Sequence, residues 1–540
     1  MYAIMHRARA ARHLLAFLAL CGVVFALLPG TAEAAKWDPR YRWNTLFTEH
    51  FAIHFHQGET DLAVELAQSA EEVHDLLVPF MEWEPAFRTQ VVLVDPTDSA
   101  NGYATTIPHN TIVIYAAPPT PESSLDNYEH WLWAIFVHEY AHILQIDKTE
   151  GVPKVLRQIL GRVIMPGGVL PRWMTEGFAT WVETRFSSGG RGRSTYTDML
   201  LRSAALEGKL PRIDTADGLG HRWPSGHLRY LYGARFHFEV AERSGKGPEG
   251  WVDFHRRHGR SIFPLYLPAK ESFGETFSRT WKAWRDELSS DYLGQAEAIA
   301  AQGRGITPTR VLASREGRPS SPRYSPDGAS ILYTHSSAHE GASVRRVQRD
   351  NSRDERVSRG AAASLDGRER VLLSSLKRTN RYALHRDLYD LNLETGERRR
   401  LSRGGRLSDA ALHPSGTWAV AVQTAAGQSQ LVRLDLPAED NKKGLAQRTP
   451  LTAAKDGTHY AHPAWDRSGE RLAVSVWKPG GFRDIHVFDA AGSHLRALTW
   501  DRASDTDPVW APDGKHLIFA SDRDGIWNLY AYRWVDGAFF

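Results

Sequence analysis

The sequence predicts a multidomain protein in which an α+β domain is followed by an all-β domain. Its 540 residues exceed a single ordinary hydrophobic core and correspond to roughly two to four domains. Long amphipathic runs mix with strand-like runs up to about residue 302, whereas short apolar runs divided by Gly and Asp turns follow from about residue 305. We therefore expect one domain over residues 36–303 and another over residues 304–540.

The composition excludes several classes of protein. Hydrophobic residues make up 42% and charged residues 24% of the chain, which is typical of a folded protein and excludes extensive disorder, collagen and coiled coil. The formal net charge of +3 gives no reason to expect nucleic acid or an anionic membrane as a partner. Arginine-rich stretches at residues 345–359 and 398–406 are explained better as solvated faces than as a polyanion site.

Residues 1–35 are expected to form a cleavable secretory signal. Three arginines precede an apolar run over residues 14–28, and Ala32-Glu33-Ala34 supplies a small-residue cleavage site. The run is shorter than the about 20 residues that a membrane-spanning helix needs. The only cysteine, Cys21, lies inside it in a context that does not favour lipid attachment. Cleavage after Ala34 would leave a secreted or periplasmic chain without a transmembrane segment and without cysteine, which excludes disulfides, thiol nucleophiles and cysteine-bound metals.

The first domain opens with strand-like and helical runs. We expect a strand at 50–56, a helix at 61–81, and strands at 89–94 and 111–116. His50, His54 and His56 are expected on one face of the first of these strands, because successive side chains alternate between its two faces. A metal cluster would explain them, but alternation on a half-exposed strand explains them as well, and we favour the second interpretation.

The central motif lies in the run Trp-Leu-Trp-Ala-Ile-Phe-Val-His-Glu-Tyr-Ala-His-Ile-Leu at residues 131–144. This run has no Gly or Pro, so it can form a continuous buried helix with His138 and His142 on one face. Neutral imidazoles suit Zn²⁺, which lowers the pKa of a bound water to about 7, and Glu139 can accept the proton when that water attacks a carbonyl. The alternative is a core helix whose histidines bond to their neighbours.

A third zinc ligand is expected in a second amphipathic helix at residues 171–183. Glu176 lies in its first turn beside the small Gly177, and it would complete a His₂Glu set with one position left for water, so that each chain binds one Zn²⁺. The alternative is that Glu176 interacts favourably with the positive end of a helix dipole. Glu183 lies seven residues further on the same face, where it either orients a ligating histidine or is a surface acid.

The motif His-Glu-Tyr-Ala-His at 138–142, followed by Trp-Met-Thr-Glu-Gly-Phe-Ala at 173–179, resembles the gluzincin metallopeptidases of the thermolysin-like MA clan. The Glu-Gly-Phe-Ala run is similar to that of the M1 aminopeptidases. The resemblance implies a zincin-like fold, zinc held by His138, His142 and Glu176, and Glu139 as the general base. The chain departs from the M1 pattern in its spacing, with 33 residues between His142 and Glu176, and it lacks the Gly-Ala-Met-Glu-Asn exopeptidase motif. Aminopeptidase specificity is therefore not supported.

The resemblance also implies a phenol near the reacting carbonyl. M1 enzymes carry a tyrosine three residues before a glycine, and Tyr230 matches this pattern, so it is the candidate catalytic donor to the oxyanion. Packing of an aromatic helix face explains it equally well, and His221, His227 and Tyr232 are near enough in sequence to replace it. The strand at 111–116 resembles the clan's edge strand, which binds extended substrates by backbone pairing.

The second domain contains a repeated turn. Its glycines, at 328, 367, 416, 469 and 514, are 39, 49, 53 and 45 residues apart, which is typical of the blades of a β-propeller, and apolar strands follow the turns. These repeats resemble the TolB and WD40-like propellers. Five turns are visible and the chain ends shortly after the Asp536-Gly537 turn, so we expect about five blades in an incomplete propeller with its last blade clipped.

Together these patterns predict an exported zinc metallopeptidase. The sequence has no Gly-x-Ser-x-Gly elbow, no phosphate-binding loop and no Rossmann fingerprint after a strand, so other hydrolase and nucleotide-dependent classes lack support. We expect a peptide or protein substrate and a propeller that binds a protein partner or restricts substrate access. The alternative is a non-catalytic, propeller-based binding protein with a zinc-binding scaffold, against which the presence of Glu139 argues, because a structural zinc site needs no base.

Overall fold

The computed structural model describes residues 37–540 apart from 122, 124, 126, 219–224, 264–266, 303–308, 326, 351–352, 366–369, 439, 442, 455, 536–537 and 540. Residues 42–540 form one compact unit, and the residues before them are assigned to a separate N-terminal unit. The expected signal over residues 1–35, with Cys21, lies outside the described residues. Among the residues that are described, no helix is long and apolar enough to cross a membrane.

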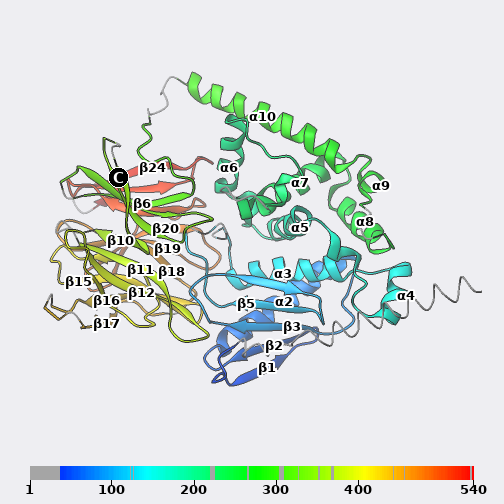
Figure 1. Ribbon diagram of the computed structural model, residues 1–540, viewed down its shortest axis with the longest axis horizontal. Helices are drawn as coiled ribbons and strands as arrows, with labels where there is room; N and C mark the ends of the chain where they lie inside the picture. The colour runs from blue at the N-terminus through cyan, green and yellow to red at the C-terminus, as the bar shows by residue number, and fades with distance from the viewer. Residues whose placement is uncertain are drawn as a thin grey trace, which may run out of the picture. The chain divides into compact units, whose positions relative to one another are not determined.

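A five-stranded sheet opens the compact unit (Figure 1). Its strands are β1 (Trp43–Phe47), β2 (Phe51–His56), β3 (Thr89–Val94), β4 (Gly102–Thr105) and β5 (Thr111–Tyr115), in the order β1-β2-β3-β5-β4. The strands β2, β3 and β5 run parallel, whereas β1 and β4 are antiparallel to their neighbours. The assignment of residues 111–116 to the edge of the sheet is wrong. Ile112, Val113 and Ile114 are buried and lie inside the sheet, and the half-buried β4 forms the edge.

The histidines near β2 do not converge. His54 bonds to Thr45 and Gln90, both at 2.9 Å, while His56 Nδ1 contacts the Gln57 carbonyl oxygen at 3.0 Å and His50 precedes the strand. The expectation of a half-exposed strand is nevertheless wrong, because every residue of β2 except His54 is buried. The strand lies between β1 and β3 and packs on helix α2, which removes its side chains from water.

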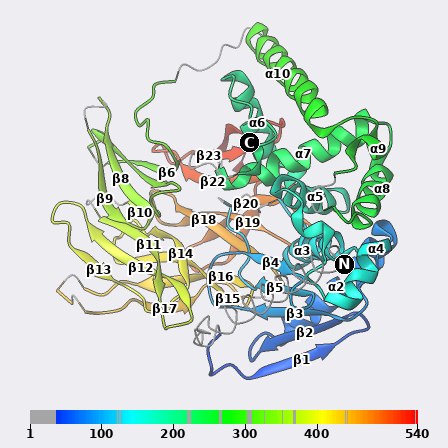
Figure 2. The ribbon, with the colours of Figure 1, turned by 45° about the vertical axis from the view of Figure 1, so that its right-hand side comes forward.

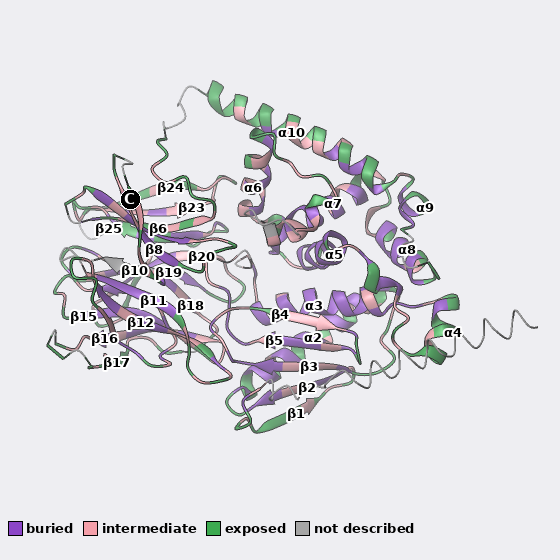
Figure 3. Ribbon diagram, viewed as in Figure 1, coloured by how far each residue is buried: buried purple, intermediate pink, exposed green. Residues whose placement is uncertain are grey.

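Helices complete the first region. They are α2 (Thr60–Met81), α3 (Trp131–Asp147), α4 (Gly151–Leu160), α5 (Arg172–Arg185), α6 (Thr195–Leu206), α7 (Leu228–Arg243), α8 (Gly247–Gly259), α9 (Ala269–Phe273) and α10 (Phe277–Ala301), with short 3₁₀ turns at Pro166–Val169, Arg191–Arg193, Thr215–Asp217 and Ser225–His227. The helix α3 packs against β4, β5, α2 and α5, and α5 packs against α7. Figure 3 shows α3 and α5 largely buried and α10 largely exposed. One hydrophobic cluster joins the sheet to these helices.

The second region is all β and consists of five four-stranded antiparallel sheets in chain order (Figure 2). Their strands are β6 (Arg318–Tyr324), β7 (Ser330–Ser336), β8 (Ser343–Gln348) and β9 (Asp354–Arg359); β10 (Ala361–Leu365), β11 (Arg370–Arg378), β12 (Leu384–Asn392) and β13 (Arg398–Arg400); β14 (Leu407–Leu412), β15 (Trp418–Ala425), β16 (Gln428–Asp435) and β17 (Gln447–Pro450); β18 (His459–Trp465), β19 (Arg471–Trp477), β20 (Arg483–Asp489) and β21 (His494–Ala497); and β22 (Asp505–Trp510), β23 (His516–Ser521), β24 (Asn528–Val535) and β25 (Ala538–Phe539). The last strand has only two residues.

The repeated glycines close the hairpin between the first and second strands of a blade. Gly328, Gly416, Gly469 and Gly514 each donate an amide hydrogen bond to the carbonyl three residues earlier, at 2.8–3.1 Å. Their φ angles of +66° to +76° are left-handed, which explains the choice of glycine. Asp366 and Gly367 of the remaining turn lie outside the described residues.

A second repeat escaped the sequence analysis. The pairing of the first two strands shifts register in every blade, at a β-bulge in the first strand. In four blades this bulge holds a non-glycine residue with φ between 44° and 52°, namely Ser321, Asp409, His462 and Asp507. A bulge bends its strand and increases the local twist, so it shapes the first strand of each blade. The four residues at the bulges differ too much in chemistry to be recognised as a repeat in the sequence.

Ion pairs join the two regions within the compact unit. The Arg406 guanidinium, from the second region, donates to Asp98 Oδ1 at 2.5 Å and to Asp95 Oδ1 at 2.6 Å, and both carboxylates are buried. The Trp477 indole donates to the Tyr128 carbonyl oxygen at 3.2 Å. The free-energy cost of burying these polar groups is offset because each of them has a hydrogen-bond partner in the other region.

Candidate metal centre

The helix α3 places two histidines on one face. Fourteen of its 17 residues are buried, as expected from a run without Gly, Pro or a polar face. His138 is 4% and His142 is 8% exposed, and their ring centroids are 4.8 Å apart. Residues four apart in a helix lie one above the other, so both imidazoles face the same point.

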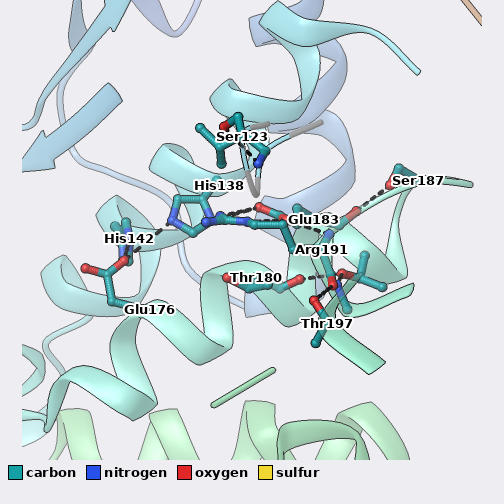
Figure 4. Close-up of polar contacts among 12 residues, drawn as sticks. Ser123, His138, His142, Glu176, Thr180, Glu183, Ser187, Arg191 and Thr197 are labelled. Carbon is teal, nitrogen blue, oxygen red and sulfur yellow. Dashed lines mark hydrogen bonds and ion pairs between the residues drawn. The ribbon is translucent and has the colours of Figure 1, made fainter. Parts of the chain in front are cut away.

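The helix α5 brings Glu176 to that point (Figure 4). Its Oε2 lies 3.2 Å from His142 Nε2 and 3.6 Å from His138 Nε2, and one ligand atom of each of the three residues lies within 4.8 Å of the others. Ligands of a tetrahedral zinc ion, at bonds of about 2.1 Å, stand about 3.4 Å from one another. The two imidazoles and the carboxylate therefore have the chemistry and the spacing that fit Zn²⁺.

Glu139 is buried on the same helix, next to His138. Burial raises the pKa of its carboxyl, and the nearby His138 and His142 oppose that rise. The edge strand β4 begins beside it. A Cβ at Gly102 would lie 3.2 Å from Glu139 Oε1 and 2.9 Å from the Ile135 side chain, so glycine lets the strand approach the helix closely.

The position of Glu183 favours the first of the two alternatives left open by the sequence. Its Oε2 lies 2.9 Å from His138 Nδ1, and the residue is 7% exposed, so it contacts the histidine and is not a surface acid. Burial alone would raise the pKa of Glu183, but Arg191 and His138 outweigh burial and lower it to about 2. An ionised carboxylate at Nδ1 fixes the tautomer that leaves Nε2 free to bind a metal.

Arg191 is a residue of the site that the sequence analysis missed. It lies in the 3₁₀ turn Arg191–Arg193, and its guanidinium donates to Glu183 at 2.7 and 2.8 Å. Its Nη2 also lies 2.7 Å from His138 Nδ1. Only one of the two contacts at Nδ1 is a hydrogen bond at any time, since Nδ1 carries either a proton or a lone pair. When Nε2 binds a metal, Nδ1 keeps its proton and donates a hydrogen bond to Glu183.

A weak sequence signal marks the Arg191 loop. Arg191 stands between Gly190 and Gly192, and a Cβ at Gly190 would lie 2.6 Å from the Cα of Thr184 in α5. The glycines therefore let the loop pack directly on the helix that carries Glu176 and Glu183. An arginine between glycines could have been noticed, but its partner Glu183 could not have been inferred from spacing.

Tyr230 is the oxyanion candidate that the structure brings to the site. Its ring centroid lies 6.1 Å from that of His138, and the Arg191 guanidinium lies 4.8 Å from its ring centroid. Burial and the charge of Glu176 raise the pKa of its phenol, which keeps the proton on the oxygen. Tyr232 instead packs in the core against Trp281, with centroids 6.4 Å apart.

Of the two histidines named as alternatives to Tyr230, His227 is exposed in the turn Ser225–His227, and His221 lies outside the described residues.

Gly177 permits a close approach between two helices. A Cβ on it would lie 2.5 Å from the Cα of Gly233, and a Cβ on Gly233 would lie 2.3 Å from the Trp173 carbonyl oxygen. The two glycines let α5 and α7 cross in backbone contact. This crossing brings Tyr230, on α7, near the candidate ligand Glu176 on α5.

Comparison with known proteins identifies the second region. Residues 444–539 match the family model PD40, the TolB beta propeller domain. The chain therefore carries a TolB-like β-propeller, with five blades in the part that the structure describes, after an α-containing N-terminal region. The matched residues all lie in the propeller, so the resemblance of residues 138–179 to the gluzincins stays a prediction.

Several solved structures are similar to this chain at low identity. TolB from Acinetobacter baumannii is 18% identical with a TM-score of 0.35, over 43% of this chain and 56% of that chain. An oligogalacturonate lyase in complex with manganese is 15% identical with a TM-score of 0.29, over 42% and 79% of the two chains. A puromycin-hydrolyzing peptidase of Mycobacterium tuberculosis is 19% identical with a TM-score of 0.28, over 41% and 37%. Similarities of this size carry no argument about activity.

Proposed function

We propose that this protein is an exported zinc peptidase that hydrolyses peptide bonds. The observation that carries the proposal is the convergence of His138, His142 and Glu176, from two helices, beside the buried carboxylate of Glu139. A site that only held a structural ion would need no free carboxylate next to its ligands. The resemblance of these residues to the gluzincin motif supports the same activity.

Each side chain of the site has a proposed task. Zn²⁺, when bound by His138, His142 and Glu176, supplies a Lewis acid that activates water and polarises a carbonyl. Glu139 accepts a proton from the attacking water and returns it to the leaving amine. The Tyr230 phenol donates a hydrogen bond to the oxygen on which negative charge develops. Glu183 and Arg191 hold His138 in its ligating orientation.

The substrate is proposed to lie along β4. This strand pairs only with β5 in the described sheet, so its outer edge can pair with an extended peptide. Its first residue, Gly102, lies against Glu139, which would place a bound peptide next to the base. The propeller is proposed to bind a partner or to restrict access to this edge, in a secreted or periplasmic setting.

Metal content tests the ligand set. Elemental analysis of the purified protein is expected to find about one zinc retained by the His₂Glu set, and Glu176→Ala is expected to lose or strongly reduce it, because two ligands remain. Glu72→Gln, at an exposed position on α2, is the control and is expected to keep the metal. An unchanged zinc content in Glu176→Ala would show that this residue is not a ligand.

Substitution of the base tests the activity. Glu139→Gln is expected to retain zinc and to lower the rate of peptide hydrolysis by about 10² to 10⁴, since the amide cannot accept the proton. Hydrolysis is measured with a peptide library, and the Glu72→Gln protein is again the control. Full activity in Glu139→Gln would refute the mechanism. Zinc binding without hydrolysis in the wild type would favour the non-catalytic binding protein.

A further inference from the structure

The helix α4 turns its apolar side chains to solvent. Of its ten residues only Pro153 is buried, and Figure 3 shows the helix coloured largely as exposed. An amphipathic helix of a globular protein normally directs its apolar face to the core. Here the apolar positions recur at intervals of three and four, which places them on one face, and they are 36–74% exposed. They are Val152, Val155, Leu156, Ile159 and Leu160, and with Val163 just beyond the helix, 74% exposed, we call them the α4 ridge.

Two arginines fasten α4 to the protein by its polar side. Arg157 Nη1 donates to the Asp147 carbonyl oxygen and to Thr149 Oγ1, both at 2.9 Å. Arg162, which follows the helix, donates to Asp147 Oδ1 at 2.6 Å, and Asp147 is buried at the end of α3. Because the helix is held through these polar groups, the α4 ridge stays outside the hydrophobic core.

The segment after α8 exposes further apolar side chains beside the start of α4. The Glu150 amide donates to the Gly259 carbonyl oxygen at 3.0 Å, and Arg260 Nε donates to Glu150 Oε2 at 2.9 Å, so the two segments are in contact. Ile262 and Phe263 come directly after these contacts and are 57% and 69% exposed. Large apolar side chains gathered on a surface in this way mark a site of interaction.

The charge around the α4 ridge indicates what covers it. Residues 151–163 contain Lys154, Arg157 and Arg162 and no acidic residue. Both arginines share the single carboxylate of Asp147, so a positive charge is left over there, and the exposed Lys154 adds another. The small net charge of the whole chain does not reveal this local excess. A helix with an apolar face flanked by cations is typical of helices that lie on anionic lipid.

We propose that the α4 ridge inserts into the headgroup region of an anionic lipid bilayer. A helix of ten residues is too short to cross the hydrocarbon core, which needs about 20, so α4 lies in the plane of the interface. A helix exposed on nearly all sides offers no groove to a protein partner, whereas a lipid surface accepts a protruding ridge. Since α4 is tied to the end of α3, binding would hold the candidate metal centre near the membrane surface. The proposal does not rest on peptidase activity.

Flotation of the purified protein with lipid vesicles tests this surface. The wild-type protein is expected to float with vesicles of phosphatidylcholine and phosphatidylglycerol, and to bind more weakly to vesicles of phosphatidylcholine alone. Ile159→Ser is expected to weaken binding to both by about 10- to 100-fold, since a buried aliphatic side chain is lost. Lys154→Gln is expected to weaken binding to the anionic vesicles alone, by about 5-fold. Both positions are exposed, so the fold should tolerate the changes.

The matched control is Leu529→Ser, which removes an aliphatic side chain that is 78% exposed on β24 of the propeller. This variant is expected to bind vesicles as the wild type does. All the proteins share the same N-terminal sequence, so differences between them report on the substituted positions. The proposal is overturned if the wild type does not float, or if Ile159→Ser binds as tightly as the wild type or no more weakly than Leu529→Ser. A wild-type dimer that Ile159→Ser dissociates in sedimentation, without vesicle binding by either protein, would assign the α4 ridge to a second copy of the chain.

Discussion

The two regions of this protein use buried charge in different ways. In the first region, His138, Glu183 and Arg191 come from three elements and converge on one point. In the propeller, several buried charged groups bond within their own blade, as Asp466 does with Arg471 five residues away, although Arg406 pairs with the first region. Local pairs form wherever the hairpin forms, whereas the convergent set depends on the packing of several helices. Substitutions in the first region should therefore cost more than similar ones in the propeller.

The largest difference is expected at Arg191. Arg191→Met leaves the buried Glu183 without its ion-pair partner, and loss of one partner of a buried pair costs about 3–5 kcal/mol of unfolding free energy. Arg433→Met, which removes the pair with the half-buried Asp435 in the propeller, is expected to cost less than about 1 kcal/mol. Urea unfolding measures both. Equal losses of unfolding free energy would show that the buried cluster contributes no more to stability than a partly exposed ion pair.

The next effect concerns pH at the contact between the regions. Glu59 is 3% exposed, and burial, together with the charge of Asp95, raises its pKa to about 7 although Arg406 opposes this. The folded state thus holds a proton that the unfolded state releases, so stability falls as pH rises from the unfolded pKa of about 4.5 through 7.

Glu59→Gln should remove this dependence. The variant is expected to match the wild type near pH 5 and to exceed it by about 1–3 kcal/mol at pH 8, since each pKa unit is worth about 1.4 kcal/mol. Thermal or urea unfolding at both pH values measures the difference, with Glu72→Gln as the control. If the variant is less stable than the wild type at pH 8, Glu59 is ionised and stabilising there.

A smaller effect is expected where α5 crosses α7. Gly177→Ala forces a methyl group against Gly233, and overpacking of this kind costs about 1–3 kcal/mol. Gly294→Ala, on α10 with open space around it, should instead stabilise by about 0.5–1 kcal/mol. Unfolding free energies of the two variants should therefore change in opposite directions. A neutral Gly177→Ala would mean that the helices can move apart freely.

The smallest effect is expected in a blade turn. Gly514 has φ +66° and open space around its Cα, so Gly514→Ala meets no clash but places a side chain in a left-handed conformation. The cost is about 1 kcal/mol. Urea unfolding should show this modest loss without any change in zinc content. A loss as large as that of Arg191→Met would show that the blades are not locally organised.

Much of the local structure followed from patterns in the chain. The expected helices at 61–81 and 131–144 are α2 and α3, and the expected strand at 89–94 is β3. The hydrophobic periodicity of these segments is strong enough that tertiary contacts do not change their secondary structure. The edge strand was misplaced because β4 has four residues, all half-buried, which give no clear alternation. The short strand β4 is positioned by its pairing with β5 and its packing against α3.

Sequence spacing alone determined that His138 and His142 share a helix face and that repeated Gly turns build blades, because both depend on backbone periodicity over a few residues. Only the tertiary structure decided that Arg191 and Glu183 meet at His138, that Gly177 serves the α5–α7 crossing, and that His50 lies on His74. Those contacts join segments whose separation along the chain carries no period. They depend on how the helices pack, and packing is a property of the whole fold.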